Sequence, residues 1–143
     1  MAVGGEFGAT GKQVGLGDYS GRTLVLYFYP KDDTPGCTTQ ACALRDQWEE
    51  FGRRAALLGV SPDDAATHLR FQEKHQLPFA LLADEGHHIA AAYGVWVEKS
   101  LYGKNYWGVE RSTFVIGPDG KIAAVARKVK PEAHAGWLAG VLP

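Results

Sequence analysis

The sequence has little cysteine, no long apolar run and almost no net charge, and each shortage excludes a class of protein. With 2 Cys in 143 residues, the chain is not a disulfide-linked scaffold. A chain of this length hides roughly 70% of its unfolded surface on folding, so a core forms without such links. The 15 Lys and Arg balance the 16 Asp and Glu to a formal net charge of -1, which gives no electrostatic reason to expect nucleic acid or an anionic membrane as a partner.

The longest apolar stretch, residues 24–29, has the length of a strand, far below the roughly 18 residues of a membrane span. The opening MAVGGEFGATGK lacks the basic start and apolar block of a secretory signal. We therefore expect a single domain over residues 1–143 in the cytoplasm, where thiols are kept reduced and a disulfide is more often transient and catalytic than structural.

Short apolar runs alternate with helix-length amphipathic segments, which predicts an α/β domain with a largely parallel sheet. Residues 23–29 (TLVLYFY) are rich in β-branched and aromatic residues and too apolar for a strand with one exposed face, so they predict a central strand covered on both faces. Apolar residues spaced by three and four predict one helix over 35–51, with Gly52 at its end.

The other expected elements come from turn and capping signals. Residues 94–108 contain Gly, Trp and Tyr without periodicity, and they predict a loop that could form a wall of a site. The rest are strands at 55–60 and 79–82, a helix from a cap at 61–64 to about His75, a short helix over 86–93 capped by Asp84, a hairpin of 112–116 and 121–125, and a C-terminal helix from Pro131 to about Leu138.

The two cysteines fall at different depths in one predicted helix. Cys37 lies in the first turn, where unpaired N–H groups and the helix dipole favour an anion, and a thiolate is the anion available. Cys42 is five residues further, which in a helix separates the two Cα atoms by roughly 8 to 9 Å, beyond the reach of about 7 Å for a disulfide. A bond between them requires the first turns to unwind. The alternative is that both are buried small hydrophobic residues.

The residues around Cys37 carry a longer pattern. Residues 27–42 (YFYPKDDTPGCTTQAC) closely resemble the active-site segment of the peroxiredoxins, and Pro30, Thr34 and Cys37 meet the pattern Pro-x-x-x-Thr-x-x-Cys. The spacing of Cys37 and Cys42 is similar to that of the subgroup called PrxQ or bacterioferritin comigratory protein. The resemblance runs from about Asp18 onward and continues at 82–85, 93–96, 98–100, 111–116 and 119–121.

This resemblance implies a thioredoxin-like α/β fold, with a central mixed β-sheet flanked by helices and an antiparallel hairpin in the C-terminal half. It implies a peroxidase in which Cys37 attacks the peroxide and becomes a sulfenic acid. Cys42 would then resolve it as an intramolecular disulfide, which thioredoxin or a similar reductant reopens. Neither a cofactor nor a metal is implied, and members of the subgroup are often monomers.

The resemblance also assigns roles to the neighbours of Cys37. Thr34 would bind the peroxide through its hydroxyl, Arg111 would stabilise charge on the leaving oxygen, and Pro30 would shield the sulfenate. The backbone N–H groups of Gly36 and Cys37 would complete the peroxide cradle. Without this resemblance, the residues alone favour ordinary roles: Thr34 as an N-cap, Pro30 as a strand terminator and Arg111 as a surface salt-bridge residue.

Two other functions use the same residues. A copper-binding module on the same scaffold would need two thiolates and a distant histidine, and a general thiol-disulfide oxidoreductase would usually carry CxxC, which is absent here. The histidines, none at ligand spacing from a cysteine, are His68, His75, His87, His88 and His134.

The start of the chain departs from the resemblance. The family usually opens with Ala-Pro-x-Phe before a hairpin, and this proline is missing, so residues 1–17 are expected to be atypical and their strands are in doubt. The GGEF at 4–7 matches a cyclase signature by accident. Residues 94–108 contain four aromatic residues: Trp96, Tyr102, Tyr106 and Trp107. They would form either an apolar collar that accepts organic hydroperoxides or ordinary packing over the sheet edge.

Overall fold

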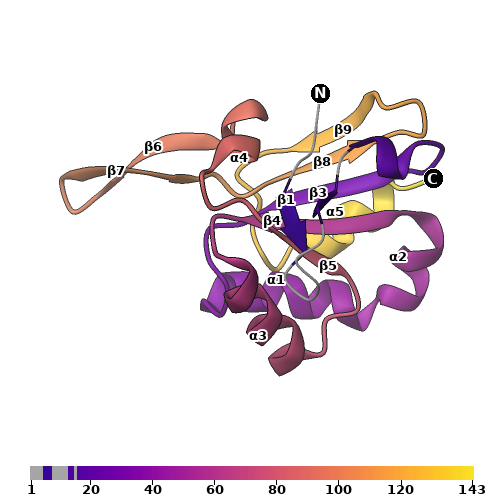
Figure 1. Ribbon diagram of the computed structural model, residues 1–143, viewed down its shortest axis with the longest axis horizontal. Coiled ribbons are helices and arrows are strands. Elements are labelled where there is room, and N and C mark those ends of the chain that lie inside the picture. The colour runs from indigo at the N-terminus through magenta and orange to yellow at the C-terminus, as the bar shows by residue number, and fades with distance from the viewer. Residues whose placement is uncertain (1–4, 8–12, 15) are drawn as a thin grey trace.

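The computed structural model describes residues 5–7, 13–14 and 16–143, and within them strands and helices alternate as expected (Figure 1). The first half contains β1 (Gly5–Phe7), β2 (Gln13–Val14), η1 (Leu16–Tyr19), β3 (Leu24–Phe28), α1 (Pro35–Asp46), α2 (Trp48–Arg54) and β4 (Ala56–Ser61). The second half contains α3 (Ala65–His75), β5 (Ala80–Ala83), α4 (His88–Ala92), β6 (Trp96–Leu101), β7 (Lys104–Val109), β8 (Ser112–Ile116), β9 (Ile122–Ala126) and α5 (His134–Val141).

The main sheet is mixed, in the order β2-β1-β5-β4-β3-β8-β9. Strands β3, β4 and β5 are parallel, as βαβ connections through helices require. The pairs β1–β2, β1–β5, β3–β8 and β8–β9 are antiparallel. The expectation of a largely parallel sheet is therefore wrong, while the mixed thioredoxin-like sheet and the β8–β9 hairpin are confirmed.

Strand β3 is central and covered on both faces, as its apolar run predicts. Val25, Tyr27 and Tyr29 pack into a cluster with residues of α1, α2, α3 and α5. Leu24, Leu26 and Phe28 point to the other face and pack with residues of α4, β5 and β8. This division follows from the alternation of side chains along a strand. The carboxyl end of β3 leads directly to the start of α1, where Cys37 lies.

The predicted helix over 35–51 is two helices that break at Gln47. Leu44, Trp48 and Phe51 keep their helical spacing across this break, so periodicity could not reveal it. Gly52 lies inside α2 and does not end it. A Cβ there would lie 2.9 Å from the Trp48 ring, so Gly52 allows the indole to pack against the helix backbone.

Residues 94–108 form a hairpin of β6 and β7 instead of the predicted loop. Tyr102 and Gly103, the two residues of its turn, both have positive φ (51° and 78°), which is the geometry of a type I′ hairpin turn. The hairpin extends away from the rest of the molecule (Figure 1).

The two ends of the chain also differ from expectation. The doubt about N-terminal strands is wrong for the described part, since β1 pairs with β2 and with β5. The remainder of the atypical segment, at 1–4, 8–12 and 15, lies outside the described residues. The C-terminal helix begins at His134, after a turn that follows Pro131.

Candidate active site

Cys37 lies in the first turn of α1, as predicted, and is 2% exposed. Thr34 is the N-cap and Pro35 follows at the first helical position, where its fixed φ suits a helix and its missing N–H costs nothing. The first helical acceptor is the carbonyl of Thr34, which receives the N–H of Thr38 at 2.8 Å. The N–H groups of Gly36 and Cys37 therefore precede the first helical hydrogen bond, which leaves them suited to an anion or a peroxide oxygen.

Arg111 is the residue just before β8, and its guanidinium contacts Cys37. Its Nη2 donates to Cys37 Sγ at 3.3 Å, and its Nη1 donates to Gln40 Oε1 at 2.6 Å. The guanidinium is thus held from two directions against the first turn of α1. A planar cation with donors to spare beside a thiol favours the thiolate and can also contact a second, oxygen-bearing group.

Gly36 makes this approach possible. A Cβ at this position would lie 3.2 Å from Arg111 Nη2 and 3.2 Å from Pro131 Cγ, closer than ordinary van der Waals contact. The absence of a side chain at Gly36 therefore gives the Arg111 guanidinium room to approach Cys37, in addition to any role of the Gly36 N–H group.

Gln40 completes the setting of Arg111, and the sequence analysis missed it. It lies three residues after Cys37, on the same side of α1, and is fully buried at 0% exposure. Its Nε2 has no hydrogen-bond partner among the described residues. The signal that could have found Gln40 is a polar residue on the helix face that packs against the sheet.

The Thr34 hydroxyl bonds within its own loop and not to the helix backbone, which an N-cap side chain usually contacts. Its hydroxyl donates to the carbonyl of Lys31 at 2.9 Å and makes no capping bond to the helix backbone. The hydroxyl proton is therefore occupied within the loop, while the oxygen keeps lone pairs that can accept a hydrogen bond. Pro30 is partly buried two residues after the end of β3, in the same loop.

Cys42 is partly buried on the same helix, and both thiols are free. Its Sγ lies 3.9 Å from His75 Nδ1, at the end of α3. Because α1 is continuous from Pro35 to Asp46, the structure has the folded form of the helix expected for the reduced protein.

A buried polar layer lies beneath the Cys37 end of α1. The pKa of Tyr27 is raised well above its ordinary value, mainly by burial, with the charges of Asp32 and Cys37 adding to the effect. Burial, and to a lesser degree Arg111, lowers the pKa of His134 to about 4. His134 Nε2 shares a hydrogen bond of 2.7 Å with Thr113 Oγ1. At neutral pH, His134 is therefore neutral and adds no charge beside Arg111.

The comparisons with known proteins agree with this geometry. The model of the AhpC/TSA family matches residues 5–125. The chain belongs to the AhpC/TSA family. Peroxiredoxin Bcp of Bacillus subtilis (strain 168) is 52% identical over 128 residues, which cover 89% of this chain and 82% of that protein. Peroxiredoxin Bcp of Escherichia coli (strain K12) is 46% identical over 125 residues, which cover 87% and 80%.

Solved structures give the same grouping. The bacterioferritin comigratory protein of Xanthomonas campestris superposes with a TM-score of 0.90 at 37% identity, covering 96% of this chain and 88% of that one. A PrxQ variant from Xylella fastidiosa gives 0.89 at 35% identity, covering 96% and 86%. The protein is thus a peroxiredoxin of the Bcp or PrxQ group, a thiol-dependent peroxidase with a peroxide substrate and a thiol reductant.

In this peroxiredoxin, Lys99 of the β6–β7 hairpin interacts electrostatically with the site. The pKa of Lys99 on β6 is lowered, mainly by burial and further by Arg111, while Cys37 acts in the opposite direction. Trp96 stacks on His87 with ring centroids 4.0 Å apart, and Tyr102 at the turn is 96% exposed. Trp96 therefore packs against the body, and the collar of the four aromatic residues stays a prediction.

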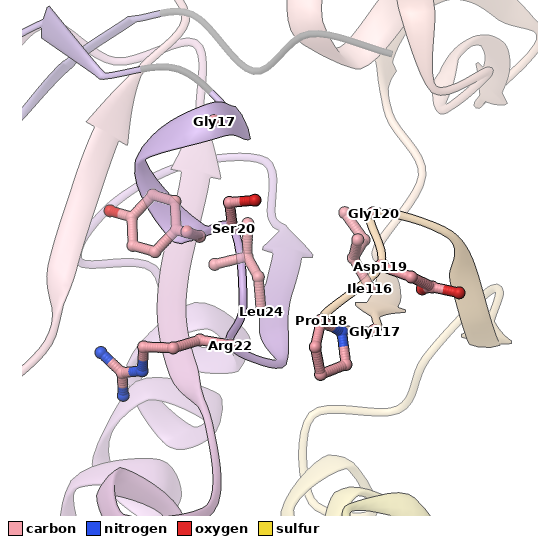
Figure 2. A pocket seen from close by; sticks show the side chains of 10 residues that line it. Gly17, Ser20, Arg22, Leu24, Ile116, Gly117, Pro118, Asp119 and Gly120 are labelled. Atoms are coloured by element: carbon pink, nitrogen blue, oxygen red, sulfur yellow. The ribbon is translucent and has the colours of Figure 1, made fainter.

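Two pockets are lined by residues other than the cysteines. One of about 230 Å³ is bordered by residues 17–24 and 116–120 (Figure 2). It includes Leu24, the first residue of β3, whereas Cys37 follows the other end of that strand. The other, of about 220 Å³, lies between the loop at Asp32 and Asp33 and the helix residues Arg70 and Lys74. Among the described residues, no group of three or more His, Cys, Asp or Glu is arranged to hold a metal. Nor does the described part of the chain contain a helix long and apolar enough to span a membrane.

Proposed function

We propose that Cys37 is the peroxidatic cysteine and reduces hydrogen peroxide and organic hydroperoxides. Its thiolate sulfur attacks one peroxide oxygen, an S–O bond forms, and the O–O bond breaks. The departing oxygen takes a proton and leaves as water or an alcohol, and Cys37 becomes a sulfenic acid. The peroxide gains two electrons and the sulfur loses them.

One observation supports this assignment most strongly: the hydrogen bond from Arg111 Nη2 to Cys37 Sγ, made beside a helix N-terminus. Negative charge moves from the sulfur to the departing oxygen during the attack. A fixed cation with several donors next to both atoms stabilises this redistribution, and the N–H groups of Gly36 and Cys37 act in the same direction. Thr34 Oγ1 would accept a hydrogen bond from the peroxide, and Pro30 would shield the sulfenic acid.

Cys42 is proposed as the resolving cysteine. Its thiolate attacks Cys37 Sγ, the S–S bond forms, and the S–O bond breaks with release of water. The first turns of α1 must unwind, since helical geometry separates the two Cα atoms by roughly 8 to 9 Å. A thiol reductant then reopens the disulfide, and thioredoxin fits the general behaviour of the family.

The family and the composition also support a wider setting. The Xanthomonas campestris relative is described with alkyl peroxide reduction activity, which supports organic hydroperoxides as substrates here. We infer that the 143 residues form one domain, which works as a monomer in the cytoplasm without nucleic acid or a membrane as a partner. The near-zero net charge and the two free thiols favour this setting.

The test is single-turnover reduction of hydrogen peroxide by the pre-reduced protein, Cys37→Ser and Cys42→Ser, with free thiols counted before and after. The parent should lose two thiols quickly, Cys37→Ser should not react, and Cys42→Ser should accumulate a sulfenic acid. A parent rate no greater than that of a free thiol would refute the peroxidase. In that case exchange with disulfide substrates would favour the oxidoreductase alternative, and stoichiometric copper binding through both cysteines would favour the copper module.

A further inference from the structure

Cys42 contacts a histidine that is itself held by a carboxylate. Its Sγ lies 3.9 Å from His75 Nδ1, and His75 Nε2 lies 3.3 Å from Asp33 Oδ1. Lys74 Nζ donates to the second oxygen of Asp33 at 2.7 Å. The three groups come from α1, from the end of α3 and from the loop before α1, so tertiary packing creates this chain of contacts.

The ring of His75 is fixed in place on several sides. Phe71 packs edge-on against it at 5.1 Å, and Arg45 Nη1, one turn beyond Cys42, donates to the carbonyl of His75 at 2.8 Å. Arg45 also pairs with Asp46. The charged and titratable groups that the structure places around His75 are thus Asp33, Lys74, Cys42, Arg45 and Asp46.

This arrangement has the order of a nucleophile, a base and a group that orients the base. An Asp33 carboxylate accepting from Nε2–H leaves Nδ1 with its lone pair toward Cys42. Hydrogen bonds from Lys74 and His75 hold the pKa of Asp33 below its ordinary value, so this carboxyl is charged at neutral pH. His75 is 18% exposed, so a proton taken from Cys42 can pass on to water.

We propose that His75 is the general base of the resolving step, with Asp33 as its positioning residue. The proposal rests on the proposed function, in which Cys42 attacks the Cys37 sulfenic acid. While α1 is folded, His75 Nδ1 takes the proton from Cys42 Sγ. The helix then unwinds, the thiolate attacks Cys37 Sγ, and the S–S bond forms as the S–O bond breaks. The hydroxide that leaves takes a proton from solvent, and His75 returns its proton to solvent, so one water is released in all.

The chemical need for such a base is clear from ordinary thiol behaviour. A free cysteine thiol has a pKa of about 8.5, so roughly 3% is thiolate at pH 7. Cys42 lies well inside α1, where the dipole of the helix start no longer favours an anion. A base in contact with its sulfur removes this limit at neutral pH and becomes dispensable at alkaline pH.

The experiment measures the rate of disulfide formation as a function of pH. Reduced protein is mixed with one equivalent of hydrogen peroxide and quenched at successive times, and mass spectrometry separates the sulfenic acid from the disulfide. In His75→Gln, disulfide formation should be on the order of tenfold slower at pH 7, and parent and variant should converge by about pH 9.5. His88→Gln, which makes the same change at an exposed residue of α4, is the matched control.

Other outcomes separate the possibilities. Equal rates for His75→Gln and the parent at pH 7 would overturn the proposal, and so would a loss that stays constant up to about pH 9.5, since that indicates a purely structural role. If His75→Gln does not fold, Asp33→Asn carries the test, with a smaller loss of about threefold at pH 7 and the same convergence. A parent that forms sulfenic acid but no disulfide, or neither, would refute the proposed function itself and this inference with it.

Discussion

The two cysteines lie five residues apart on one helix, yet their surroundings have little in common. Cys37 is almost fully buried and faces a guanidinium that is held by Gln40. Cys42 is partly exposed and faces an imidazole that is held by Asp33. One thiol is thus paired with a permanent cation and the other with a group that gains and loses protons.

This difference matches the two steps of the proposed cycle. The attack on a peroxide needs a thiolate and a stabilised leaving oxygen in the same place, which a fixed cation supplies at any pH of physiological interest. The resolving attack needs a thiolate that is ready when the helix unwinds, and in the proposed step His75 takes the proton from Cys42 while α1 is still folded. Cys37 and Cys42 are the same residue type on the same helix, so their different roles follow from their different contact partners.

The largest effect is expected from Arg111, whose removal would take the cation from the Cys37 end. Arg111→Ala should lower the second-order rate constant for peroxide by on the order of 100- to 1000-fold, and Arg111→Lys by less, since it keeps the charge but loses the two-pronged geometry. Stopped-flow consumption of hydrogen peroxide measures both, with Arg127→Ala on the surface as the control. An Arg111→Ala protein that reacts at the parent's rate would show that the contact is only structural.

Protonation of His134 offers a second way to disturb the Cys37 end. Because burial lowers the pKa of His134 to about 4 in the folded protein, against about 6.5 when unfolded, the unfolded chain binds this proton first as the pH falls. The stabilisation is complete above pH of about 6.5 and is lost toward pH 4, at a cost of up to about 3 kcal/mol.

Urea unfolding at pH 7 and at about pH 4.5 tests this point, with His134→Gln beside the parent. The parent should lose more stability than the variant between these two values, since only the parent carries this titrating group. Equal losses in both proteins would place the acid sensitivity elsewhere, for example in the carboxylates.

Gln40 should show a smaller, more selective effect. Gln40→Leu removes the acceptor that orients Arg111, so the rate constant for peroxide should fall by about tenfold, the value of one charge-assisted hydrogen bond. It also removes the Nε2 group that has no partner in the described part of the chain, so the free energy of unfolding should change by less than about 1 kcal/mol. Gln47→Leu at the exposed helix break is the control. Loss of activity that follows loss of folding would contradict this assignment.

The smallest effect is expected at Thr34, the N-cap of α1. Thr34→Val removes the hydroxyl that donates to Lys31, and the peroxide rate constant should fall by about fivefold, while Thr34→Ser should stay close to the parent. The same stopped-flow assay compares the pair. A valine variant as fast as the parent, beside a slow serine variant, would mean that the methyl group and not the hydroxyl determines the loop conformation.

Most of the sheet could be predicted because its strands are apolar without interruption. Strand β3 is the clearest example, since a run such as residues 24–28 is stable only with both faces covered. Helix α3 was also placed well, because Asp64 caps it and its side chain accepts from the N–H of Thr67. Capping and continuous burial are local signals that the sequence displays directly.

The β6–β7 hairpin could not be found in this way. Its residues are mostly half-buried or exposed, so no apolar period marks either strand. The turn carried the only local signal, a glycine at Gly103 after Tyr102, and tyrosine is an uncommon residue at positive φ. Pairing within the hairpin therefore decides the structure where burial does not.

Resemblance to a known family, more than residue periodicity, identifies the residues of the site. Arg111 and Cys37 are 74 positions apart, and only tertiary packing or a known family brings them together. Gln40 and His75 were missed as site residues because a buried glutamine and a histidine at a helix end have many ordinary roles. Their roles depend on the atoms that they contact, and the sequence does not show these contacts.

Rapid-quench peptide mapping of the reduced parent after one equivalent of hydrogen peroxide tests the central division most directly. The account predicts that an oxygen atom appears first on Cys37, and that it disappears as a Cys37–Cys42 disulfide forms. Oxygen that appears first on Cys42, or on both cysteines at once, would contradict it.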